Sequence, residues 1–141
     1  MKPLTLALIL LLGLPLVASA QEINSYTEAQ QWMLAEAQLV ETLQSPVVGV
    51  RTQALKNAIV LATLYRDKVD LSSAVSAIEQ VYEDDNAATR KLALAALQAI
   101  GDRWAAAYLA RHVPPVEMEE SRALVASVLN EYYGAKMAAL Q

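Results

Sequence analysis

The sequence predicts an all-helical domain, and three observations carry this prediction. Ala, Leu, Gln, Glu and Arg dominate the chain beyond residue 20, and all of them favour helices. The few Gly and Pro residues punctuate the apolar-periodic segments. No segment has the alternating, β-branched pattern of a strand.

The first 20 residues predict a cleaved secretory signal peptide. Lys2 supplies a positive start, residues 4–17 are almost wholly apolar, and Ala18-Ser19-Ala20 has the small-x-small pattern of a cleavage site. The alternative is an uncleaved membrane anchor, but the apolar run is shorter than the roughly 20 residues that cross a bilayer. The absence of Cys excludes a lipoprotein anchor. We expect cleavage after Ala20 and export to the periplasm or the exterior.

Residues 21–141 form one domain by length. The signal segment contains Lys2 and no acid, so of 11 Lys and Arg residues 10 remain, against 15 Asp and Glu residues. This acidic balance argues against a nucleic-acid partner, since phosphates require a basic face. No second apolar run and no basic amphipathic segment indicates contact with a membrane after signal cleavage. Because the chain has no Cys, packing alone must stabilise it.

Capping signals divide this domain into six helices. The spacing Ser25 to Glu28 suits a capping box and opens a helix over 26–43. Ser45-Pro46 is read as an N-cap followed by a first-turn proline, opening a second helix that runs to about residue 66. Asp70 caps a third helix over 71–82.

The remaining three helices follow from the same kind of signal. Asp84, Asp85 and Asn86 offer caps for a fourth helix, which Gly101 closes. Asp102 opens a fifth, which runs to about residue 112. Pro114-Pro115 then breaks the chain before a sixth helix over 116–133, with Gly134 as its C-terminal stop.

The first two helix pairs resemble each other at an offset of 39 residues. Apolar residues of the first helix map onto those of the third at helical spacing: Trp32, Ala35, Leu39 and Leu43 onto Leu71, Ala74, Ile78 and Tyr82. The second and fourth helices match through Arg51 and Arg90, with apolar residues behind each. Arg122 repeats the pattern at a further offset of 32, near the start of the last helix.

The segment Asn86–Asp102 resembles the second helix of a HEAT repeat, with its Arg90, Leu97, Ile100 and terminal Gly-Asp. The resemblance extends more loosely over residues 25–134. It implies a short right-handed α-solenoid of about three antiparallel helix pairs, whose second helices line a concave surface. It also implies that Arg51, Arg90 and Arg122 are structural residues between repeats, bonded to carbonyls or acids at neighbouring turns; candidates are Asp84, Asp85 and Asp102. A plain six-helix bundle is the alternative fold.

The family's usual role, binding other proteins, makes the chain an interaction or scaffold module. Taking the Arg side of each second helix as buried, the opposite side is the candidate partner-binding face. It comprises Gln53, Lys56 and Val60, then Leu92, Ala95 and Ala99, then Leu124, Ser127 and Glu131. Apolar residues on an exposed face often mark partner sites. In the alternative, neighbouring helices cover these residues and they belong to the core.

No pattern predicts catalysis, a cofactor or a metal. His112 is the only His and stands at a helix end, where it can satisfy carbonyls, and one His without Cys cannot form the usual zinc sites. The run Glu83–Asn86 lacks the spaced ligands and the Gly of a calcium loop. We therefore expect no enzyme. The alternatives are a secreted enzyme, which needs paired acids in a deep pocket, and a helical bundle that associates with itself.

Overall fold

The computed structural model describes residues 26–140, which form six helices without a strand. The predicted all-α class is confirmed. The predicted signal peptide lies outside the described residues. The helices are α3 (Glu28–Leu43), α4 (Val48–Leu64), α5 (Ser72–Asp84), α6 (Ala87–Ile100), α7 (Arg103–His112) and α8 (Pro115–Ala139). None of these helices is long and apolar enough to cross a membrane.

The predicted caps of α6 and α7 are confirmed. The Asn86 side chain accepts a hydrogen bond from the Thr89 amide at 3.0 Å, and the Asp102 side chain accepts one from the Ala105 amide at 2.8 Å. Between these helices Gly101 has φ +58° and donates its amide to the Leu97 carbonyl. This left-handed conformation suits glycine, which explains why α6 ends there.

Three other helix ends differ from the prediction. The capping box of α3 pairs Thr27 with Gln30, so this helix begins at Glu28. The Ser45 hydroxyl accepts from the Val47 amide in a turn, and α4 begins only at Val48. Asp70 accepts a hydrogen bond from the Ser72 amide. Helix α5 begins at Ser72, one residue later than predicted, and continues to Asp84.

The largest difference is at the C-terminus. The sixth helix was predicted to stop at Gly134, but α8 passes through this residue and runs to Ala139. An isolated glycine costs a helix only about 1 kcal/mol relative to alanine. Because the helix formers Ala135 to Ala139 follow it, Gly134 does not end the helix.

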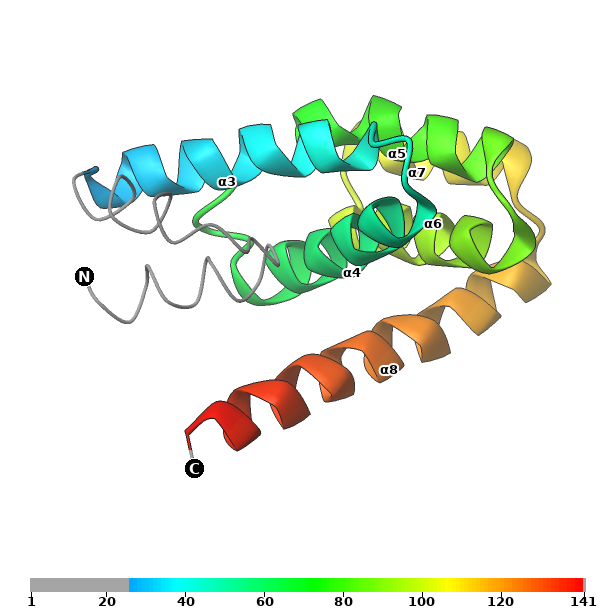
Figure 1. The fold of residues 1–141 in the computed structure, drawn as a ribbon. Coiled ribbons are helices and arrows are strands. Elements are labelled where there is room, and N and C mark those ends of the chain that lie inside the picture. The colour runs from blue at the N-terminus through cyan, green and yellow to red at the C-terminus, as the bar shows by residue number, and fades with distance from the viewer. Residues whose placement is uncertain (1–25, 141) are drawn as a thin grey trace.

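Consecutive helices run in opposite directions and pack in layers. In Figure 1, α3 and α5 run along the upper edge, α4 and α6 lie below them, and α8 follows the lower edge. Helix α3 packs on α4 and α5, α5 packs on α6, and α7 packs on α6 and α5. The most extensive contact joins α4 and α6, the two helices that begin with the repeated arginines.

Helix α8 is placed differently from its counterparts. Whereas α4 packs on α3 and α6 on α5, α8 makes its main contacts with α6 and α4 instead of α7. It also contributes little to the core. Only two of its 25 residues, Ser121 and Val128, are buried, against eight of 17 in α4 and eight of 14 in α6. The core therefore lies in α3 to α7, and α8 rests on its surface.

Candidate functional site

Arg51 makes the contact expected of it. Its Nε donates to Asp85 Oδ2 at 2.6 Å, and its Nη1 donates to the Ser45 carbonyl at 2.8 Å. One guanidinium thus joins the α3–α4 turn to the α5–α6 turn. The hydrogen bond to Arg51 lowers the pKa of Asp85, and the same bond raises the pKa of Arg51.

The other two arginines make different contacts. Arg90 Nε donates to the Tyr82 carbonyl at 2.7 Å, and its guanidinium lies 4.9 Å from the centre of the Tyr82 ring. Both partners belong to the same helix pair, so this contact is not the expected bond between repeats. Arg122 is exposed and lies beside Gln98, whose amide oxygen accepts from its Nε at 3.1 Å. Only Arg51 therefore links two pairs through an acid.

The candidate partner-binding face is partly wrong. Val60 and Leu92 were expected at the surface but are buried, at 2% and 8% exposure, and Ala95 is buried with them. The physical reason is that α4, α6 and α8 pack side by side, so neighbouring helices cover the side opposite the arginines. Gln53, Ser127 and Glu131 are exposed, while Lys56, Ala99 and Leu124 are half-buried.

The face predicted on α4 meets the face predicted on α8. Lys56 Nζ lies 3.2 Å from both carboxylate oxygens of Glu131, 75 residues away in the chain. Gln53, Lys56 and Val60 also share the lining of a small cleft of about 220 Å³ with Val128 and Glu131. Part of the surface predicted for a partner is therefore occupied by the protein's own last helix.

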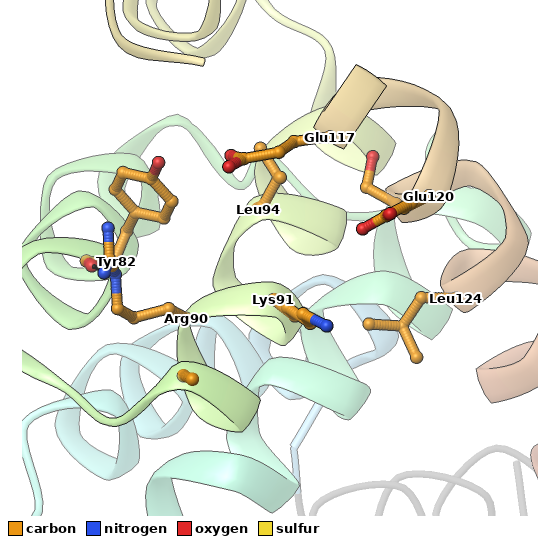
Figure 2. Close-up of a pocket in the computed structure, with 9 residues that line it drawn as sticks. Tyr82, Arg90, Lys91, Leu94, Glu117, Glu120 and Leu124 are labelled. Carbon is orange, nitrogen blue, oxygen red and sulfur yellow. Dashed lines mark hydrogen bonds between the residues drawn. The ribbon is translucent and has the colours of Figure 1, made fainter. Parts of the chain in front are cut away.

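A larger pocket lies between α6 and the first turns of α8, with a volume of about 420 Å³. Figure 2 shows that side chains from α6 and the first turns of α8 face this space, with Tyr82 of α5 at one side. Its lining residues are Tyr82, Ala87, Arg90, Lys91, Leu94, Glu117, Glu120, Ser121 and Leu124. The walls are charged, and Ala87, Leu94 and Leu124 supply an apolar surface between them.

The two walls of this α6–α8 pocket carry opposite charges. The cations Arg90 and Lys91 stand on α6, and the acids Glu117 and Glu120 stand on α8. Among the residues that the structure describes, no ion pair within 4 Å joins these four. Charges that are close but unpaired can form hydrogen bonds with a ligand that carries both signs.

A third space separates α8 from α7. It has a volume of about 730 Å³ and is lined mainly by Leu109 and Val113 of the α7 side and Met118 of α8, with Gln98 and Arg122 at one edge. Surface clefts therefore lie on more than one side of α8. Native cores are close-packed, so this spacing marks α8 as a surface-attached element.

Sequence reasoning singled out Arg90 and Leu124 but missed the other residues of the α6–α8 pocket. Glu117, Glu120 and Lys91 are not among the candidate residues of the sequence analysis. The pocket depends on where α8 crosses α6, which no local pattern states. A sequence signal does exist in hindsight: the last helix places two acids at positions that face α6 if α8 lies alongside it.

The remaining polar candidates have structural partners. His112 Nδ1 lies 3.0 Å from the Tyr108 carbonyl, and its ring stacks on Tyr108 at 4.2 Å. Tyr108 Oη donates to Glu83 at 3.0 Å, and burial together with this bond raises the pKa of Tyr108. Within residues 26–140, no group of three His, Asp or Glu side chains is arranged to hold a metal ion.

Comparison of the chain with protein-family models, with curated proteins and with solved structures finds no significant match.

Proposed function

We propose that the chain is an exported interaction module built as a short HEAT-like solenoid, which binds another protein or peptide. The first two helix pairs support the solenoid, because each pairs antiparallel helices and Arg51 bonds the turn of the following pair. The apolar segment and the Ala18-Ser19-Ala20 triplet support export. The third helix pair departs from this arrangement, since α8 packs on α6 and α4 and not on α7.

The α6–α8 pocket is the observation that carries the binding proposal. It combines an apolar surface from Leu94 and Leu124 with cations on one wall and acids on the other. Protein interfaces have this composition, with an apolar centre inside a polar, charged rim. A peptide segment that carries an apolar side chain between charges of opposite sign would complement it.

Paired variants test this proposal. Lys91→Glu combined with Leu124→Glu reverses one wall and adds charge to the apolar surface, at one exposed and one half-buried position. Met33→Glu is the matched control, because Met33 is 70% exposed on α3. The tagged mature domain and the control variant should enrich the same protein from the native cell envelope, and the double variant should not, while all three keep the same melting temperature. Equal enrichment by all three would refute this binding site.

A second candidate function is a carboxylate enzyme, because Glu117 and Glu120 line the same pocket. Both acids stand on one wall, three residues apart on α8, where they cannot flank a substrate from two sides as paired acid and base groups do. They face Arg90 and Lys91 instead, which suits charge complementarity. Conversion of Glu117 and Glu120 to Gln would discriminate the binding module from the enzyme. If the acids serve recognition, binding of the partner should weaken by several-fold, without complete loss.

A further inference from the structure

Helix α8 contacts the rest of the protein through one buried apolar residue, several half-buried ones and a set of polar contacts. Lys56 pairs with Glu131, and the Tyr65 and Tyr132 hydroxyls lie 3.1 Å apart. Gln98 of α6 contacts the Ser121 hydroxyl and the Met118 carbonyl, with its amide oriented to satisfy both. Interfaces that are polar and incompletely packed are typical of parts that move relative to each other.

The body formed by α3 to α7 holds almost the whole apolar core. Of the 28 buried hydrophobic residues in the described chain, Val128 is the only one from α8. The remaining ones lie between Trp32 and Leu109 and form one continuous cluster. Because hydrophobic burial is the main favourable term in folding, the apolar contacts among α3 to α7 would still stabilise the body without α8, while the residues of α4 and α6 that α8 covers would need a replacement.

The connection between α7 and α8 is short and extended. Val113 has φ −123° and ψ 124°, and Pro114 has φ −65° and ψ 150°. Pro114 and Pro115 prevent α7 from continuing into α8, since neither has an amide hydrogen and each holds the preceding residue extended. The connection can therefore direct α8 away from its own body without loss of a regular hydrogen-bond ladder.

We propose that two copies of this chain exchange α8, so that the last helix of each copy lies on α4 and α6 of the other. Every contact that α8 makes within one chain is available from a second copy, so the exchange needs no new interface. Lys56 of one copy would pair with Glu131 of the other. The α6–α8 pocket would then have its cations from one chain and its acids from the second.

The second copy is the occupant that the geometry favours, because α8 is the one helix whose fit to this surface is shown. Its Val128 fills the apolar point of contact, and Glu131 and Tyr132 meet Lys56 and Tyr65. The exchange does not depend on the proposed partner protein, because it concerns only contacts already present within the chain.

Cysteine cross-linking tests the exchange, and the natural chain has no Cys to interfere. Two single variants, Lys56→Cys and Glu131→Cys, are made in the mature chain, one of them with a size tag. They are mixed at high concentration, incubated and treated with a short bismaleimide. Exchange predicts a cross-linked heterodimer on a denaturing gel, several-fold above the control. The control mixes Glu36→Cys with Ser73→Cys, a pair in contact between α3 and α5 of the body.

Light scattering of the unmodified chain gives the second measurement. Exchange predicts a dimer fraction that grows with concentration, alongside the heterodimer of Lys56→Cys and Glu131→Cys. A heterodimer yield no greater than in the Glu36→Cys and Ser73→Cys mixture overturns the proposal, whether the unmodified chain is a monomer or a dimer. If the unmodified chain is a dimer without this heterodimer, the copies associate through another surface.

Discussion

Arg51 and Asp85 stand 34 residues apart in the chain and form a 2.6 Å ion pair that joins the α3–α4 turn to the α5–α6 turn. The Arg51 side chain is one-fifth exposed, and Asp85 is almost covered. Because the guanidinium also bonds the Ser45 carbonyl, its planar fork fixes two turns at once. It is the only ion pair in the described chain that joins one helix pair to the next through turns.

Replacement of Arg51 by Ala should lower the urea midpoint of unfolding more than replacement of Arg90, which bonds only the Tyr82 carbonyl of its own pair. Arg51→Lys should recover little of the loss, because an ammonium cannot form both bonds in the geometry of the fork. Arg103→Ala, at an exposed position on α7, is the control and should leave the midpoint unchanged. Equal midpoints for all these variants would show that the arginines do not stabilise the stack.

The ion pair should also make stability depend on pH. Its hydrogen bond lowers the pKa of Asp85 below the ordinary value of 3.8. A carboxyl whose pKa is lowered on folding stabilises the protein above its unfolded value and loses this contribution as the pH falls through the folded value. Asp85→Asn should therefore cost stability at pH 7, and the difference from the natural protein should shrink below pH 3.8. Thermal melts across this range would measure it; a constant difference would contradict the assignment.

Glu79 should have the opposite effect. Burial and the nearby Glu83 raise the pKa of Glu79 above 4.5, against weaker attraction from His112 and Arg111. A carboxyl whose pKa is raised on folding opposes folding while it is ionised, so Glu79→Gln should raise the melting temperature at pH 7. The gain should disappear below pH 4.5, where the carboxyl is protonated in both states. Glu41→Gln, on the exposed face of α3, should change nothing at either pH.

Two glycines should respond oppositely to alanine. Gly101 has a positive φ, so Gly101→Ala should cost about 1–2 kcal/mol of unfolding free energy. Gly49 is the second residue of α4, and a Cβ added there would meet open space, so Gly49→Ala should stabilise the protein by up to about 0.5–1 kcal/mol. Urea unfolding of the two variants measures both values. A loss at Gly49 would mean that α4 does not begin where the structure places it.

The helices were largely predictable from sequence because their signals are local. Asn86, Gly101 and Asp102 act on backbone groups within three or four residues, and each ends or begins a helix as predicted. The HEAT resemblance also included Asp85, the partner of Arg51, among three candidate acids. Gly134 misled the prediction, since a glycine without a following breaker does not stop a helix.

The candidate site was not predictable because it depends on a contact between distant helices. The sequence predicted that Lys56 and Glu131 both belong to the candidate partner-binding face. It did not predict that the two side chains contact each other. The arginine register defined the buried side of α4 and α6 correctly, but on α8 the same side is only half-buried. The predicted exposed side was wrong at Val60, Leu92 and Ala95. A helix packed between two others, as α6 is between α4 and α8, has more than one buried side, so the position opposite an arginine need not meet solvent.

Leu92 and Leu124 allow the corrected face to be tested one residue at a time. Leu92 is 8% exposed within α6, so Leu92→Glu would place a charge in the core without a partner. Such a charge costs about 3–5 kcal/mol, and the variant should unfold at a much lower urea concentration.

Leu124 is half-buried at the α6–α8 pocket, so Leu124→Glu should change the unfolding free energy by less than about 1 kcal/mol and keep the helical circular dichroism. If the pocket binds a partner, Leu124→Glu should nonetheless weaken binding at least ten-fold, since it charges the apolar surface between the two walls. Equal loss of stability in both variants would place Leu124 in the core and remove the pocket as a binding surface.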